Sequence, residues 1–254
     1  HARATSFAGE FARDNSPPID TVTRARLARD PVAVPELLAA GRLAYDMLRY
    51  ARAESLFARA LAASAATETP AARRARAASH LGHALVLQKR RDWDGSLTVL
   101  IRSLSEYVSS EALETLANTL VRLGRTDEAI SAAEWGIRLN PYHDPSHYLL
   151  GNGYARKNYT QLEAAYPDAF ADATGRRALA AADAELAAGR AAAARRGYAA
   201  QVEAHPGGVD GRARLASLDF EQGRFAEARD GCFAALATCP EYGRAHAILA
   251  KALE

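Results

Sequence analysis

The 254-residue sequence contains few cysteines and few aromatic side chains. Its two cysteines, Cys232 and Cys239, do not provide the disulfide or zinc framework of a small cross-linked domain. On one helix they would lie roughly 10 Å apart, too far for a disulfide. Aromatic residues make up 7% of the chain. A β-sandwich or barrel draws heavily on aromatic and β-branched residues, so this composition disfavours both.

Charge imbalance and long apolar runs are also lacking. With 32 basic and 30 acidic side chains the formal charge is +2, which creates no long-range field and does not indicate nucleic acid or an anionic membrane as a partner. No segment approaches the ~18 uninterrupted apolar residues of a membrane span. Phosphate-loop, nucleophile-elbow, zinc-protease and haem-attachment motifs are absent from the sequence. The sequence therefore predicts a protein that is not an enzyme, without catalytic residues, cofactor or metal.

What the sequence has in excess is alanine, at about 60 residues, far above ordinary usage. Hydrophobic residues make up 49% of the chain, and most of them are small. A core built from methyl groups requires backbones that approach each other closely, which helices packed on helices achieve. The composition therefore predicts an all-α fold.

Small residues also recur at nearly regular intervals. Seven of them, each preceded by Leu or Ala, follow one another at steps of 41, 35, 34, 31, 34 and 34 residues: Gly41, Gly82, Ala117, Gly151, Ala182, Ala216 and Ala250. A second small residue follows each of the first six after about twelve positions: Ala53, Ser96, Ala129, Ala164, Ala194 and Ala228. Glycines 124, 189 and 223 stand between the expected paired helices, where glycine readily adopts the left-handed conformation that ends a helix. Prolines 141, 206 and 240 close repeats.

This pattern resembles the tetratricopeptide repeat (TPR) family, whose 34-residue unit follows W-x2-L-G-x2-Y…A-x3-F…P. The resemblance covers about residues 36–254, and its clearest copies are 110–143 and 209–242. It implies a right-handed α-solenoid of helix-turn-helix repeats, with a concave surface formed mainly by the first helix of each pair. Each pair cannot bury its apolar faces alone, so stacked neighbours complete the core.

The repeat pattern divides the chain into four parts. Residues 1–35 form a proline-punctuated N-terminal segment in which only 21–29 could make a short helix. Repeats one to four occupy 36–157, and 176–254 holds repeats five and six plus a C-terminal helix that we expect to cap the array. Between them, 158–175 is an irregular break, because Pro167 interrupts the expected second helix of its repeat. The break either shapes a binding pocket or is a deletion without a special role.

The TPR resemblance also directs attention to side chains on the concave face. Asn118 and Asn152 follow the small residue of the third and fourth repeats, and Arg122 and Arg156 lie one turn further along. An amide can bond an extended peptide backbone, and a guanidinium can hold a carboxylate with two bonds. Tyr148 lies one turn before Asn152. These five residues are the predicted partner-binding groove, although exposed Asn and Arg are also ordinary on a solvated helix.

Histidines offer a weaker pattern. His80 and His83 lie three positions apart on one helical face and could form half of a metal site. No neighbouring acid or cysteine completes the ligand set, so we interpret them as structural. In the run from 140 to 154, Asp144 before Pro145 is typical of a helix N-cap, and His147 falls at a large buried position of the repeat.

Together these features predict a non-enzymatic protein-interaction module that presents a concave groove to a peptide or helix of a protein partner. The alternative is an accessory subunit of a larger assembly, held by its convex face, its repeat ends and its N-terminal arm. His1 stands where an initiator Met is expected, which slightly favours an exported, processed chain over a cytoplasmic one.

Overall fold

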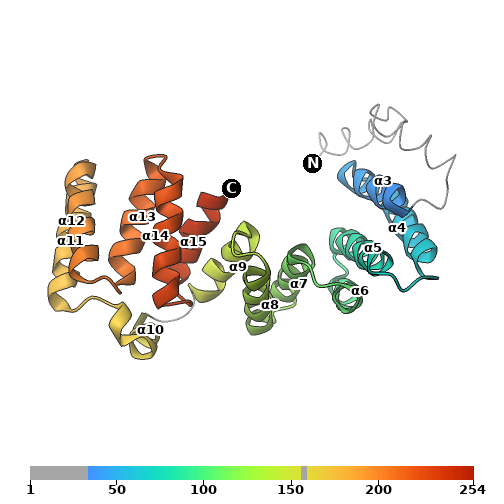
Figure 1. The fold of residues 1–254 in the computed structure, drawn as a ribbon, viewed down its shortest axis with the longest axis horizontal. Coiled ribbons are helices and arrows are strands. Elements are labelled where there is room, and N and C mark those ends of the chain that lie inside the picture. Colours follow the sequence, from blue (N-terminus) through green and yellow to red (C-terminus); the bar gives the residue numbers. More distant parts are fainter. Residues whose placement is uncertain (1–33, 156–158) are drawn as a thin grey trace. The chain divides into compact units, whose positions relative to one another are not determined.

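The structure is a computed structural model that describes residues 34–155 and 159–254. Most of the N-terminal segment, including the short helix expected at 21–29 and His1, lies outside the described residues. The described part consists of α-helices joined by short turns, with one short 3₁₀ segment and no β-strand (Figure 1). The all-α class and the helix-turn-helix repeats predicted from the sequence are confirmed. The chain forms two compact units, His1–Arg125 and Thr126–Glu254.

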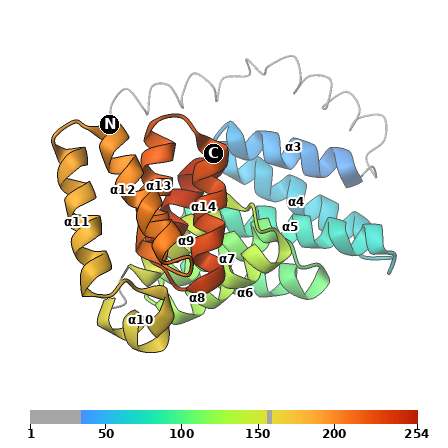
Figure 2. The same ribbon diagram turned by 60° about the vertical axis from the view of Figure 1, so that its left-hand side comes forward.

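In the first unit each helix packs against the next along the chain. Its helices are α3 (Val34–Asp46), α4 (Tyr50–Ser64), α5 (Pro70–Lys89), α6 (Trp93–Glu106) and α7 (Ser110–Arg122). Figure 2 shows α3, α4 and α5 side by side. Side-chain caps begin the last three of these helices, since Thr69, Asp92 and Ser109 each accept a hydrogen bond from a backbone N–H in the first turn.

The second unit begins with α8 and includes the segment for which the sequence predicts a break. Its elements are α8 (Thr126–Leu139), α9 (Asp144–Tyr154), α10 (Tyr159–Ala165), the 3₁₀ segment η1 (Pro167–Ala169), α11 (Ala173–Ala187), α12 (Ala191–Ala204), α13 (Val209–Glu221), α14 (Phe225–Thr238) and α15 (Gly243–Leu253). The break thus takes the form of a seven-residue helix followed by a single turn that starts at Pro167. Pro167 lacks the N–H needed to continue α10.

The three predicted glycine turns are confirmed. Gly124, Gly189 and Gly223 have φ values of +75°, +76° and +75°, a conformation that costs an L-residue with a Cβ about 1–2 kcal/mol. Two other turns reach the same region without glycine, at Leu48 with φ of 60° and at Arg91 with φ of 63°. The turn between paired helices therefore requires a left-handed backbone conformation, but it does not require glycine.

The small repeat positions are where neighbouring helices approach most closely. Ala53, Ala117, Ala194 and Ala228 are fully buried, and the other first-helix positions are buried as well. One predicted position differs: Ala164 is exposed. It lies in the shortened α10, which ends one residue later. The fourth repeat therefore does not make the second-helix contact that the other repeats make at this position.

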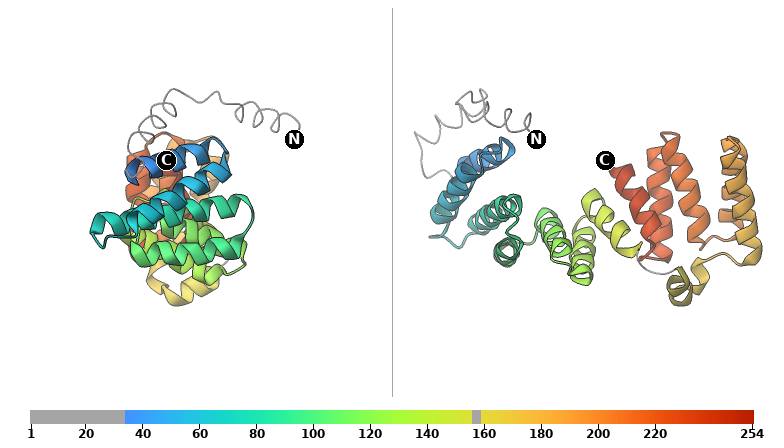
Figure 3. Two further views of the ribbon diagram at one scale, coloured as in Figure 1. Left: turned by 90° about the vertical axis from the view of Figure 1, so that its right-hand side faces the viewer. Right: turned by 180° about the vertical axis from the view of Figure 1, so that it is seen from behind.

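Helix α15 contacts three other helices. It packs against α13 and α14, as the first helix of a seventh repeat should, and also against α9, almost one hundred residues earlier. The red C-terminal helix lies beside the yellow-green α9 in the right-hand view of Figure 3. At Gly151 and Gly243 the two backbones come so near that an added Cβ would lie 3.0 Å and 2.9 Å from the backbone nitrogens of Ala247 and Ala155.

Candidate functional site

The first pair of predicted groove residues lies on α7. Asn118 and Arg122 are both exposed, one turn apart, as predicted. The Arg122 guanidinium carbon lies 5.8 Å from the centre of the Trp93 ring, within range of a cation–π interaction. That contact orients the guanidinium without using its N–H groups, which stay available to a carboxylate.

The second pair lies on α9, whose opposite face is buried against its neighbours. The Tyr148 side chain is 63% exposed and Asn152 is exposed. Arg156 lies outside the described residues. The predicted N-cap is wrong by one residue, because Asp144 is the first residue of α9 and His143 precedes it without a side-chain cap. Asn118 with Arg122 and Tyr148 with Asn152 thus form two exposed pairs, one in each compact unit.

Of the two histidines of α5, His83 has a carboxylate partner. His83 Nε2 lies 3.3 Å from Glu54 Oε1, and the same carboxylate accepts a 2.6 Å hydrogen bond from Arg90. Burial lowers the pKa of His80, and the nearby Arg102 lowers it further. Within residues 34–155 and 159–254, no cluster of three or more His, Cys, Asp or Glu side chains is placed to hold a metal ion. The same residues include no helix long and apolar enough to cross a membrane.

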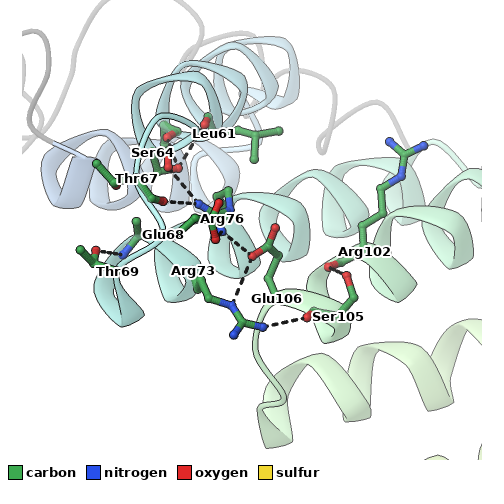
Figure 4. Close-up of polar contacts among 12 residues, drawn as sticks. Leu61, Ser64, Thr67, Glu68, Thr69, Arg73, Arg76, Arg102, Ser105 and Glu106 are labelled. Carbon is green, nitrogen blue, oxygen red and sulfur yellow. Dashed lines mark hydrogen bonds and ion pairs between the residues drawn. The ribbon is translucent and has the colours of Figure 1, made fainter.

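Sequence reasoning missed a buried arginine at the 41-residue step. Arg76 of α5 is 7% exposed. It donates hydrogen bonds of 3.1 Å and 2.7 Å to the carbonyls of Ser64 and Thr67, and it bonds Glu106 Oε2 at 2.8 Å (Figure 4). The Glu68 carboxylate also contacts it at 3.1 Å. One side chain therefore fixes the α4–α5 loop, which lies within the 41-residue step, to the end of α6.

A second missed feature is the contact between α9 and α15. His147 and His246 are buried, and their Nδ1 atoms lie 2.8 Å apart. Each ring also bonds, at 2.8 Å through Nε2, the carbonyl of the proline six residues before it, Pro141 or Pro240. The repeated spacing Pro-x5-His is visible in the sequence, but only the fold shows that the two copies meet.

An apolar cleft of about 250 Å³ opens beside these histidines. It is lined by Ile137, Pro141, His147, Phe233, Leu236, Ala237, Pro240 and His246. The lining comes from the end of α8 and the start of α9, and from the matching part of α14 and α15. The cleft therefore lies where the ends of two helix arrays meet.

Comparisons with known proteins give likenesses of fold only. No protein-family model matches the chain, and no curated protein matches its sequence. The solved structure of YrrB, described as a TPR protein with an unusual peptide-binding site, is 13% identical, with 88% of this chain and 95% of that chain covered and a TM-score of 0.43. A TPR protein of Thermus thermophilus is 20% identical, with 87% and 99% covered and a TM-score of 0.41. The type IV pilus biogenesis factor PilW is 12% identical, with 94% of each chain covered and a TM-score of 0.45.

The chain's own residues define its repeats. First-helix small positions recur at steps close to 34 residues and are buried, and three predicted turns carry left-handed glycine. Consecutive helices pack in pairs at α3–α4, α5–α6, α11–α12 and α13–α14. These are the elements of the tetratricopeptide pattern. The chain is an all-α protein built of tetratricopeptide-type helix pairs.

Proposed function

We propose that the protein is a non-enzymatic interaction module that binds a peptide or helix of a protein partner through exposed side chains of its first helices. The observation that carries the proposal is the α9 pair, Tyr148 and Asn152. Tyr148 is 63% exposed one turn from an exposed amide, which leaves a large aromatic surface in water. This pairing is a common composition for a recognition surface, because the ring supplies contact area and the amide supplies directional hydrogen bonds.

The α7 pair supports the same role in the other unit. Arg122 rests near Trp93 and keeps its charge exposed, and Asn118 lies one turn away. An acidic or C-terminal carboxylate on the partner would match this arginine. Since the net charge of the chain is only +2, selectivity would come from such local contacts rather than from long-range attraction.

The test is a selection of peptides from a displayed library against the full chain, followed by calorimetric titration of the selected peptides. Tyr148→Ala with Asn152→Ala should weaken binding at least tenfold, and Asn118→Ala with Arg122→Ala should weaken it if the peptide reaches α7. Arg102→Ala, an exposed arginine on a second helix, is the matched control and should leave binding unchanged. Equal affinity in the α9 double variant, with unchanged helicity by circular dichroism, would refute the proposal.

A second candidate function is that of an accessory subunit held by the other face of the array. Large apolar side chains are exposed on α8 and just beyond it: Trp135 at 50%, Leu139 at 48% and Tyr142 at 59%. A permanent partner would cover such a surface. Native mass spectrometry of the protein purified from its source distinguishes the two functions, because a subunit is recovered in a complex of fixed stoichiometry and a groove-binding module is also recovered free.

A further inference from the structure

The histidine pair between α9 and α15 cannot satisfy its contacts with the hydrogens of two neutral rings. The carbonyls of Pro141 and Pro240 only accept hydrogen bonds, so each Nε2, at 2.8 Å, must carry a hydrogen. The contact of 2.8 Å between the two Nδ1 atoms needs one more hydrogen, because two lone pairs repel each other at that distance. Two neutral imidazoles carry two N–H hydrogens in total, whereas these three contacts need three.

We propose that His147 and His246 share one proton between their Nδ1 atoms, and that this one-proton pair makes the contact between α9 and α15 a latch that acid releases. In the closed form the pair carries a single positive charge. A second proton would place hydrogens on all four ring nitrogens, so the two Nδ1–H groups would point at each other. The latch therefore has to open to accept it.

The surroundings make a second charge costly. The ring centres of His147 and His246 lie 5.1 Å apart, the Tyr154 ring is 5.7 Å from that of His246, and the Phe233 ring is 6.3 Å from that of His147. Burial is the main reason why the pKa of His147 is lowered and that of His246 is lowered to about 4. Burial therefore opposes any charge on the pair. For the first proton this cost is offset by the three contacts that need a third hydrogen, whereas no contact offsets it for a second proton.

Charged groups on the neighbouring elements also affect the protonation of the histidine pair. At the start of α9, His143 lowers the pKa of His147 and Asp144 raises it. The Glu134 carboxylate of α8 accepts a hydrogen bond from the Tyr154 hydroxyl. The charge of Glu241, in the turn before α15, raises the pKa of the same tyrosine. From α14 the pair meets the uncharged Phe233 ring.

The proposal predicts how many protons opening takes up. In the open form both histidines titrate near pH 6.5 and hold almost two protons at pH 5, whereas the closed pair holds one. Since the opening equilibrium follows the difference in bound protons, the opening constant should rise five- to tenfold for each pH unit from pH 6 to pH 4.5. A closed pair with two neutral rings would give a rise approaching a hundredfold per unit, and a pair with no role would give none.

Amide hydrogen exchange of the full chain, corrected for the pH dependence of intrinsic exchange, measures that slope on α9 and α15. The double variant His147→Gln with His246→Gln should lose it, because two side-chain amides can bond both proline carbonyls and each other without an extra proton. His83→Gln, in the other compact unit, is the matched control and should keep the slope. A slope near zero or near a hundredfold, or a slope that persists in the double variant, would overturn the proposal.

A second measurement keeps the test decisive if the double variant does not fold. Nitrogen-15 NMR of the imidazole rings of the unaltered chain at pH 6 counts the hydrogens on the pair directly. Three N–H hydrogens on the four ring nitrogens are expected. Two or four would contradict the shared proton.

Discussion

Replacing Gly82 by alanine should destabilise the first compact unit, although alanine is the better helix former. A Cβ built at this position would lie 2.4 to 2.6 Å from three atoms of the Phe57 ring. The ring cannot withdraw, because the backbone at Gly41 closes its other side so tightly that a Cβ there would lie 2.6 Å from it. Phe57 is 4% exposed, which leaves no route to solvent.

The size of the effect follows from two opposing terms. Overpacking a filled core costs about 1–3 kcal/mol, and contacts this short place Gly82→Ala in the upper part of that range. Replacing glycine by alanine inside a helix stabilises the helix by about 1 kcal/mol. The free energy of unfolding should therefore fall by about 1–2 kcal/mol, which lowers the melting temperature by several degrees in a chain of this size.

Thermal unfolding followed by circular dichroism, with hydrogen exchange of α4 and α5 to locate the change, measures the effect. Phe57→Leu in the Gly82→Ala background should restore part of the loss, so the double variant should be more stable than the sum of the single effects predicts, by about 1 kcal/mol. Gly211→Ala is the control, because its added Cβ meets Val202 at an ordinary 3.4 Å. A neutral or stabilising effect of Gly82→Ala, or no recovery with Phe57→Leu, would show that the Phe57 ring does not block the added Cβ.

Three further predictions concern turns, charge and thiols. Gly223→Ala should lower the free energy of unfolding by about 1–2 kcal/mol in denaturant titrations, because φ is +75° there, and a neutral result would contradict the strain. The Arg76 guanidinium lowers the pKa of Glu106, so this pair stabilises the fold above the ordinary carboxylate pKa and loses that effect as the pH falls through the lowered value. Arg76→Lys should weaken that acid-side dependence in melting curves measured against pH. The Cys232 thiol is buried with its pKa raised to about 12, so iodoacetamide at pH 8 should label it only after denaturant is added.

Much of the repeat architecture is readable from the sequence because its determinants are local. The glycine turns depend on φ at one residue, and the small positions recur at a spacing that one helix pair repeats. Asn118, Arg122, Tyr148 and Asn152 were likewise placed on exposed helix surfaces from their offset to those small positions. Their role as a groove is not encoded in the same local way, since recognition depends on a molecule that the sequence does not contain.

Long-range contacts account for what the sequence could not show. Arg76 looks like an ordinary helix-surface arginine, and only the approach of the α4–α5 loop and α6 buries it. Likewise Pro167 predicts that the second helix of the fourth repeat is interrupted, but not which element would cover α9 instead.

Paired helices with close contacts at alanine and glycine can be predicted from the residues alone, because backbone conformation and helix periodicity are encoded over a few residues at a time. The contact between α15 and α9, which brings His147 to within 2.8 Å of His246 across 99 positions, becomes visible only in the folded chain. It forms because α9, which is followed by a shortened α10, and α15, at the end of the described chain, each present an apolar face. Each of these two helices covers the other.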